Sequence, residues 1–274
     1  MIPAAFDYVR VDSADAAVAA LVEHGEDAKI LAGGHSLVPL LKLRLASPSV
    51  LVDVGRVKDL SFIRDGGDHI AIGALTRHRD VEMSTMLAEH VALLPLVARE
   101  VGDPQVRHRG TIGGSVAHAD PASDLPGAMV ALNATLVARG PKGERTIAAS
   151  DFFHGFLTTA LGADELLTEI RVPKITGAKA NYQKFNRRAQ DWAIVGVAAW
   201  KLNGACGIGL VNMGSAPVKA SSVEAAVKSG ASAVDAAATA AEGTDPPSDL
   251  NASVEYRQHL ARVLTRRALE ACGA

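Results

Sequence analysis

The N-terminal stretch combines a helical pattern of apolar positions with two short apolar runs. Ser13 can cap the helix and Gly25 can end it. One face of this helix is expected to be apolar and to consist of Val18, Leu21 and Val22. The apolar runs at residues 28–31 and 50–54 lie between turn-forming residues and are predicted strands. Together these elements predict a compact α/β unit.

The next part of the chain predicts a hairpin followed by helices. Apolar pairs at residues 62–63 and 70–72 flank the sequence Asp-Gly-Gly-Asp at residues 65–68. Glycine tolerates the positive φ of tight turns, so this pattern favours a β-hairpin. A helical region is predicted to begin at Thr76, and apolar spacing over residues 93–101 predicts a second amphipathic helix.

Glycine and proline then indicate a loop, a strand and a linker. We expect residues 111–115, which contain a glycine pair, to form a loop. Residues 166–172 are a predicted strand, and Pro-Lys-Ile-Thr-Gly at residues 173–177 is a predicted linker. The fold class is therefore α/β (α+β). We expect a larger region at residues 1–175, with subdomains of about 1–57 and 58–175, and a C-terminal domain at 178–274.

The C-terminal part has the pattern of a small antiparallel sheet with helices. Its predicted strands lie at residues 182–185, 194–202 and 205–211. Asn203-Gly204 joins the last two strands, and Asn-Gly between apolar runs is a strong hairpin signal. Ala-rich helical segments follow, and a last helix is expected from about Asn251, with its apolar face formed by Leu260, Val263, Leu264 and Ala268.

Composition narrows the classes of function. The 274-residue chain has 28 Lys and Arg against 30 Asp and Glu, a net charge of −2 that gives no reason to expect nucleic acid. No apolar segment is long enough to insert in a membrane and no secretion signal is visible, so a cytoplasmic location is expected. Cys206 and Cys272 form no CxxC pair, which predicts no zinc or iron–sulfur centre on this chain. Aromatic residues make up only 4%, a hint that substrate binds elsewhere.

Two glycine pairs are the candidate binding motifs. Backbone N–H groups can approach the phosphates of a dinucleotide where no Cβ intervenes, and Gly33-Gly34 and Gly113-Gly114 each stand beside residues able to hydrogen-bond. Neither G-x-G-x-x-G nor G-x-x-x-x-G-K-[ST] occurs, which excludes the Rossmann and P-loop fingerprints. Taken alone, each pair is weak evidence, and an ordinary tight turn is favoured.

The surroundings of both pairs resemble a known family. Residues 32–37, Ala-Gly-Gly-His-Ser-Leu, resemble the first FAD loop of the flavoprotein subunits of molybdenum hydroxylases. Residues 110–126 resemble their second loop nearly position by position. Further family segments are resembled by residues 166–170, 182–185, 187–191, 256–260 and 266–269, so the likeness covers essentially the whole chain. Within the family, the chain resembles the medium subunit of aerobic carbon monoxide dehydrogenase and its relatives.

This resemblance implies a fold, a cofactor and partners. The fold is a two-subdomain FAD-binding region of the vanillyl-alcohol-oxidase type followed by a C-terminal domain of a small antiparallel sheet and helices. Non-covalent FAD would pass electrons from iron–sulfur clusters to an external acceptor, quinone or NAD. The clusters and the molybdenum cofactor would lie on a small and a large partner chain, in a dimer of heterotrimers. No catalytic residue and no metal ligand is implied on this chain.

The resemblance also assigns cofactor-binding residues. They are Ala32, Gly33, Gly34, His35, Ser36, Leu37, Thr111, Ile112, Gly113, Gly114, Ser115, His118, Asp120, Asp124, Leu167 and Lys184. A carboxylate beside phosphates would repel them, so Asp124 is expected to bind ribose or ribityl hydroxyls. Asp191 and Trp192 stand where the family places residues near the isoalloxazine ring, although Trp192 could equally pack in the core.

Alternatives remain for several of these residues. A Gly-Gly-His-Ser sequence also resembles the loop of stand-alone oxidases in which histidine bonds covalently to the flavin, which would make His35 a flavin attachment site. His118 and Asp120 could form a metal pair, but no third ligand is near in sequence and a hydrogen bond within the loop is favoured. The basic runs at residues 77–79 and 107–109 are either a binding surface or solvated side chains. A scaffold that has lost its flavin is the non-enzymatic alternative.

Overall fold

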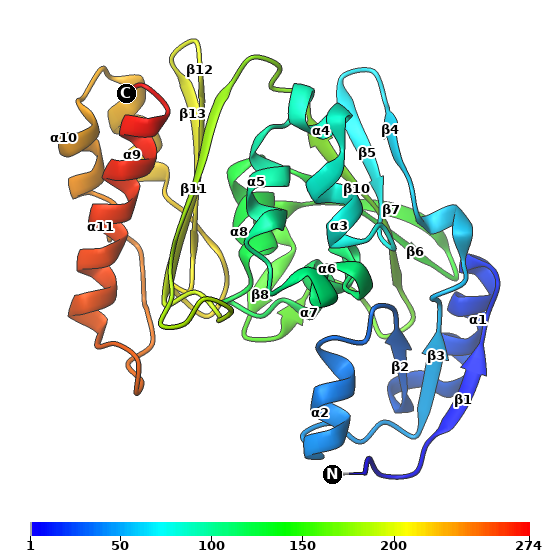
Figure 1. Cartoon of the computed structure of the whole chain (residues 1–274). Coiled ribbons are helices and arrows are strands. Elements are labelled where there is room, and N and C mark those ends of the chain that lie inside the picture. Colours follow the sequence, from blue (N-terminus) through cyan, green and yellow to red (C-terminus); the bar gives the residue numbers. More distant parts are fainter. Residues whose placement is uncertain (1) are drawn as a thin grey trace.

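The computed structural model describes residues 2–274, and its first sheet is built from parallel strands (Figure 1). The strand order is β1-β3-β2, with β1 (Asp7–Arg10), β2 (Ala28–Leu31) and β3 (Val50–Asp53). The helices of this part are α1 (Ala14–His24) and α2 (Leu37–Leu43), and a short 3-10 helix, η1, covers Gly25–Asp27. Ser13 caps α1 as predicted, accepting from the Ala16 N–H at 3.1 Å. The placement of Val22 on the apolar face is wrong, because its side chain is 54% exposed.

The second sheet has five antiparallel strands. Its order is β4-β5-β10-β6-β7, with β4 (Ile63–Asp65), β5 (His69–Gly73), β6 (Thr135–Gly140), β7 (Gly143–Ala148) and β10 (Leu166–Pro173). The predicted hairpin is confirmed as β4–β5, and the predicted strand at 166–172 is β10. Sequence analysis missed β6 and β7. A separate two-stranded ribbon consists of β8 (Phe153–Gly155) and β9 (Thr158–Thr159).

Six short helices lie between β5 and β6 in the chain. They are α3 (His78–Met83), α4 (Thr85–His90), α5 (Leu93–Arg99), α6 (Pro104–Arg109), α7 (Ile112–His118) and α8 (Asp124–Ala131), and the 3-10 turns η2 (Lys58–Leu60) and η3 (Ala149–Asp151) lie outside this segment. The helix predicted over residues 93–101 is confirmed as α5. The loop predicted at residues 111–115 is wrong, because Thr111 caps α7 and the glycine pair lies in its first turn. Contacts beyond the local sequence hold these glycines in a helix.

The third sheet is antiparallel and is covered by helices on both faces. Its strands follow the order of the chain, β11 (Lys179–Phe185), β12 (Val195–Leu202), β13 (Ala205–Val211) and β14 (Val218–Lys219). Three helices follow, α9 (Ser221–Lys228), α10 (Ala233–Ala238) and α11 (Val254–Ala271). The last helix begins at Val254 rather than near Asn251, because Ser253 caps it and accepts from the Tyr256 N–H at 3.3 Å. The Asn203-Gly204 turn is confirmed, with φ of 48° and 82°.

Residues of β12 connect the two larger parts of the molecule. Ala198 and Trp200 point to one face of the strand and join the core around α5 and α8, whereas Val195 and Val197 face the core under α9–α11. The third sheet thus lies between the helices of the second part and the C-terminal helices (Figure 1). The predicted fold class is confirmed, and the residue limits of the domains stay a prediction. No helix within residues 2–274 is long and apolar enough to span a bilayer.

Candidate functional site

The two glycine loops lie against each other, although 80 residues separate them in sequence. A Cβ atom on Gly33 would stand 2.4 Å from the carbonyl oxygen of Arg109 and 2.8 Å from the Cα of Gly110. Real Cβ atoms do not approach backbone so closely, and only glycine fits at position 33. The segment that leaves β2 therefore packs directly on the segment that enters α7.

The first loop presents a series of backbone N–H groups without partners. Within residues 2–274, the N–H groups of residues 33–36 donate no hydrogen bond to a backbone or side-chain acceptor. Gly34 has φ of +78°, which turns the chain sharply, and the Val38 N–H returns to its carbonyl at 2.9 Å. His35 is exposed and Leu37 begins α2. Successive unpaired N–H groups in such a turn form a concavity suited to an anion.

The second loop uses its N–H groups differently. Thr111 accepts from the Gly114 N–H through its side chain at 3.2 Å, while Ile112 and Gly113 donate to Thr76 and Ala74 at 3.0 and 2.9 Å. The Ser115 N–H donates to Thr111 at 3.0 Å. Gly113 is packed so closely on Ala74 that a Cβ would stand 2.4 Å from the alanine Cβ. The first glycine of this pair is therefore required for packing against Ala74.

Gly114 is the residue of the second pair that faces the first loop. A Cβ atom there would stand 3.9 Å from the Cβ of Ala32 and 2.7 Å from Thr111 Oγ1. Gly114 and Ser115 are partly buried, unlike Gly113. The two loops therefore form one cradle, defined here as residues 32–37 and 111–115, in which the first loop offers N–H groups and the second contributes Gly114, which has no side chain.

Asp124 and Lys184 form a buried ion pair. The Lys184 Nζ atom lies 2.9 Å from Asp124 Oδ2 and also donates to the carbonyl of Glu100 at 2.9 Å. Tyr182 donates its hydroxyl to the other carboxylate oxygen at 2.5 Å. The side chains of Lys184 and Asp124 are 6% and 7% exposed. Both oxygens of Asp124 thus already accept hydrogen bonds from β11, and its predicted contact with FAD hydroxyls stays a prediction.

Burial dominates the electrostatics of this cluster. Burial raises the pKa of Asp124, and the charge of Lys184 acts in the opposite direction, with smaller help from the hydrogen bonds of Lys184 and Tyr182. The pKa of Tyr182 is raised well above its usual value by burial and then by the neighbouring carboxylate. The phenol is therefore a permanent donor here, and removing Lys184 would leave Asp124 without its main counter-charge.

Three further predicted residues take different positions. His118 ends α7 half-buried, and burial lowers its pKa. Asp120 accepts from the Ala122 N–H at 2.9 Å, which is a hydrogen bond within the loop. Across residues 2–274, no three His, Cys, Asp or Glu side chains cluster in a way that could hold a metal ion. Leu167 is 4% exposed within β10 and packs in the core.

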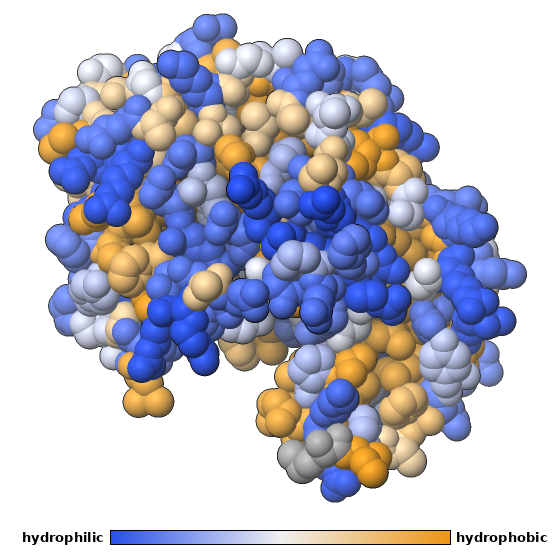
Figure 2. All heavy atoms as spheres, in the orientation of Figure 1, coloured by the Kyte–Doolittle hydropathy of each residue, from blue (hydrophilic) through white to orange (hydrophobic). Residues whose placement is uncertain are grey.

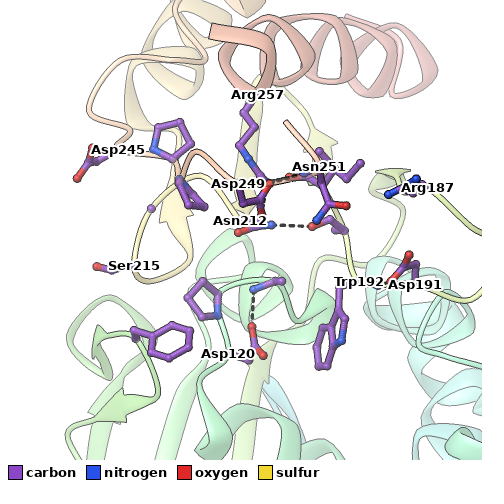
Figure 3. Close-up of a pocket in the computed structure, with 18 of the residues that line it drawn as sticks. Asp120, Arg187, Asp191, Trp192, Asn212, Ser215, Asp245, Asp249, Asn251 and Arg257 are labelled. Atoms are coloured by element: carbon purple, nitrogen blue, oxygen red, sulfur yellow. Dashed lines mark hydrogen bonds and ion pairs between the residues drawn. The ribbon is translucent and has the colours of Figure 1, made fainter. Parts of the chain in front are cut away.

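A cavity of about 650 Å³ opens at the C-terminal end of α7 (Figure 3). Asp120, Phe156 and Trp192 line one part of it, and Figure 3 shows Asp120 and Trp192 below Asp249 and Arg257. Trp192 is 53% exposed, so its alternative placement in the core is wrong. Its neighbour Asp191 is held by Arg188 at 2.9 Å, which lowers the pKa of Asp191.

The other side of the cavity comes from residues that sequence analysis did not identify. Arg257 reaches down from α11 with 1% of its side chain exposed and contacts Asp249 at 2.8 Å. It also donates to the carbonyl of Ile194, and Asn212 donates to that of Ala193 at 2.8 Å. The sequence signal that could have identified Arg257 is the presence of an arginine on the otherwise apolar face of the predicted C-terminal helix. Its partners lie 8 and 63 residues away in sequence, a pairing that periodicity cannot show.

Comparison with known proteins agrees with this geometry. Residues 4–175 match the FAD binding domain in molybdopterin dehydrogenase, and residues 180–272 match the CO dehydrogenase flavoprotein C-terminal domain. The chain is 39% identical to the glyceraldehyde dehydrogenase medium chain of Sulfolobus acidocaldarius, over 98% of this chain and 99% of that one. It is 40% identical to the carbon monoxide dehydrogenase medium chain of Afipia carboxidovorans, over 98% and 97%.

Solved structures give the same result. A chain of the carbon monoxide dehydrogenase from Hydrogenophaga pseudoflava, in a form that lacks the Mo-pyranopterin moiety of the molybdenum cofactor, superposes with a TM-score of 0.96. The sequences are 39% identical, and the match covers 100% of this chain and 99% of that chain. The glycine cradle, the two matched domains and the full-length likeness lead to one assignment. The chain belongs to the family of FAD-binding medium subunits of molybdenum hydroxylases.

Proposed function

We propose that the cradle of residues 32–37 and 111–115 binds the diphosphate of FAD without a covalent bond. The unpaired N–H groups of residues 33–36 carry this proposal, because an anion would satisfy donors that the fold leaves open. The absence of a side chain at Gly114 fits the close approach of a phosphate. Asp124, Lys184 and the backbone of Leu167 complete the proposed set, with His118 and Asp120 at the far end of α7.

The proposed role is electron transfer from iron–sulfur clusters of a partner chain to an external acceptor, either quinone or NAD. When bound, FAD supplies the redox chemistry, and this chain binds and orients it. Medium chains of a glyceraldehyde dehydrogenase and of a carbon monoxide dehydrogenase are about equally similar to this chain, at 39% and 40% identity. Because these two enzymes are named for different substrates, the similar identities favour a subunit that does not contact the substrate of the complex.

We further propose that the chain works with a small iron–sulfur subunit and a large molybdenum-binding subunit, as a dimer of heterotrimers. The molybdenum cofactor named in the Hydrogenophaga structure supports such a large subunit. A cytoplasmic location is proposed because Cys206 and Cys272 are both free thiols, as is usual in a reducing compartment.

Titration of FAD into the purified apo chain tests the central proposal. Quenching of flavin fluorescence monitors the titration, and we expect saturation at one FAD per chain. Acid precipitation should release all flavin into the supernatant. Purification of the native complex with metal analysis tests the partners, with iron and molybdenum expected. A chain that binds no FAD would contradict the proposed site, and a metal-free homomer that oxidises substrate would contradict the electron-transfer role.

The second candidate function is a stand-alone oxidase with flavin bonded to His35. The exposure of His35 on the first loop is the observation that favours it, since the imidazole is free to react. In that case flavin would remain in the acid precipitate, and His35→Ala would release it. Non-covalent binding predicts that His35→Ala leaves the flavin content near one per chain.

A further inference from the structure

Two basic runs of the sequence meet next to the glycine cradle. Residues 77–79 begin α3 and residues 107–109 end α6, and these two helices pack on each other. Figure 2 shows hydrophilic side chains gathered over α3 and α6, above the notch that separates the lobe of α2 from the rest of this face. Four arginines therefore share a small area.

Carboxylates balance only part of this charge. Glu82 pairs with Arg79 at 3.2 Å and with Arg107 at 2.9 Å. Within residues 2–274, neither Arg77 nor Arg109 has a carboxylate oxygen within the 4.0 Å of an ion pair. The guanidinium of Arg77 donates instead to the carbonyl oxygen of Arg109. A carbonyl carries no net charge, so this hydrogen bond does not balance the charge of Arg77.

Arg77 stands where the two loops of the cradle touch. Its backbone forms an isolated antiparallel bridge with Thr111, the first residue of the second loop. The carbonyl that it binds, that of Arg109, is the same one that lies against Gly33 in the first loop. Through this carbonyl its guanidinium is linked to Gly33, the first of the four residues whose N–H groups lack acceptors.

The surroundings do not compensate the charge of Arg77. Burial lowers its pKa, and the neighbouring Arg109 lowers it further, while Asp80 and Asp53 act in the opposite direction. Asp53 is already engaged, since it accepts from Tyr8 and from the Gly55 N–H at 2.7 Å. The apo chain thus holds an unbalanced cation beside unsatisfied donors, an arrangement that an anion with several oxygens would stabilise.

We propose that Arg77 binds the diphosphate of FAD and, with Arg109 beside it, supplies the positive charge that the two glycine loops lack. This inference rests on the proposed function. Arginine suits the position because its planar fork can bond to a phosphate while one nitrogen remains on the Arg109 carbonyl. Arg77 is accordingly a binding and positioning residue that connects both loops to the cofactor.

Binding measurements with matched variants test this role. FAD is titrated by fluorescence into the wild-type apo chain and into Arg77→Gln, Arg77→Lys and the control Arg79→Gln, at several NaCl concentrations. Arg79 lies in α3, two residues after Arg77, but its charge is paired with Glu82. We expect Arg77→Gln to weaken FAD binding about 10- to 100-fold, the usual effect of losing a charge-assisted hydrogen bond. Arg77→Lys should recover part of the loss, and Arg79→Gln should change affinity less than about twofold.

Salt dependence separates charge from structure. Because the proposed contact is electrostatic, the affinity of Arg77→Gln should respond less steeply to NaCl than that of the wild type. Equal affinity of Arg77→Gln and Arg79→Gln would overturn the proposal, and so would a loss of affinity with an unchanged salt response, which would mark a purely structural role. Failure of the wild-type chain to bind FAD would instead overturn the proposed function.

Discussion

The carboxylate of Asp124 and the ammonium of Lys184 meet at 2.9 Å inside the protein, one at the start of α8 and the other in β11. Their contact joins the FAD-binding part of the chain to the C-terminal sheet. A buried pair of this kind contributes little compared with an apolar contact of the same size, but losing one partner leaves an unpaired buried charge. The pair therefore makes the junction sensitive to single substitutions.

We predict that Lys184→Met lowers the free energy of unfolding by about 3–5 kcal/mol at pH 8. The loss should be smaller at pH 5, and the sign follows from linkage. Burial raises the pKa of Asp124, and without Lys184 the pKa rises further. The folded variant then holds a proton that the unfolded chain releases above about pH 4, so its stability falls as pH rises through the folded pKa. Urea unfolding at both pH values measures this difference.

The double variant Asp124→Asn/Lys184→Met is the control for this prediction. It removes both charges while keeping similar volumes, so it should be more stable than Lys184→Met at pH 8 and should lose the added pH dependence. A single variant whose deficit is the same at pH 5 and pH 8 would show that Asp124 is not the group that titrates.

Gly114→Val is predicted to abolish FAD binding. A Cβ at this position would stand 2.7 Å from Thr111 Oγ1, and the branches of valine would project into the cradle. Gly114 has no positive φ, so the effect comes from space and from loss of the Thr111 cap rather than from backbone strain. Flavin content of the purified variant is the measurement. Gly67→Val is the matched control, since Gly67 has φ of +92° but no neighbour within 4 Å of a Cβ, and it should keep its flavin.

The acid stability of the chain should depend on His78. This side chain is 4% exposed, its Nδ1 has no hydrogen-bond partner, and its ring packs where a Gly110 Cβ would otherwise stand. Burial lowers its pKa from 6.5 to about 4, with smaller effects of His35, Arg107 and Arg77. Between these values the unfolded chain binds more protons than the folded one, so stability decreases as pH falls from about 6.5 to about 4.

The full effect amounts to about 3 kcal/mol at pH 4. Thermal unfolding between pH 4 and pH 7 should show a flatter profile for His78→Leu than for the wild type. His154 is exposed, and His154→Gln should reproduce the wild-type profile. A slope that His78→Leu leaves unchanged would assign the acid sensitivity to other groups.

Much of the fold followed from local patterns. The Ser13 cap, the hairpin around Gly67 and the Asn203-Gly204 turn are short-range signals, and the structure contains each of them. The meeting of the glycine loops was expected from the resemblance of two segments rather than from physics, since no local pattern predicts that Gly33 packs on Gly110. The predicted cofactor-binding residues stay predictions, with their geometry now described.

The remaining errors have a common physical cause. Glycines 113 and 114 disfavour a helix, yet hydrogen bonds from Ile112 and Gly113 to Thr76 and Ala74 hold them in α7. Similarly, β7 carries mostly exposed side chains, so no alternation of buried and exposed positions marked it as a strand. Such tertiary contacts override local preference, and a single sequence does not display them.

The two tryptophans provide the last prediction, because they occupy opposite environments. Trp192 is 53% exposed on the wall of the cavity, whereas Trp200 is 9% exposed and donates to the carbonyl of Ala131 at 2.8 Å. If the flavin ring binds next to Trp192, Trp192→Ala should weaken FAD binding about 2- to 10-fold through loss of an aromatic contact. The melting temperature of Trp192→Ala should stay near that of the wild type, since an exposed side chain contributes little to stability. Trp200→Ala should destabilise the fold by about 3–5 kcal/mol. Fluorescence titration and thermal unfolding of both variants decide the matter: unchanged FAD affinity in Trp192→Ala would place the flavin ring elsewhere.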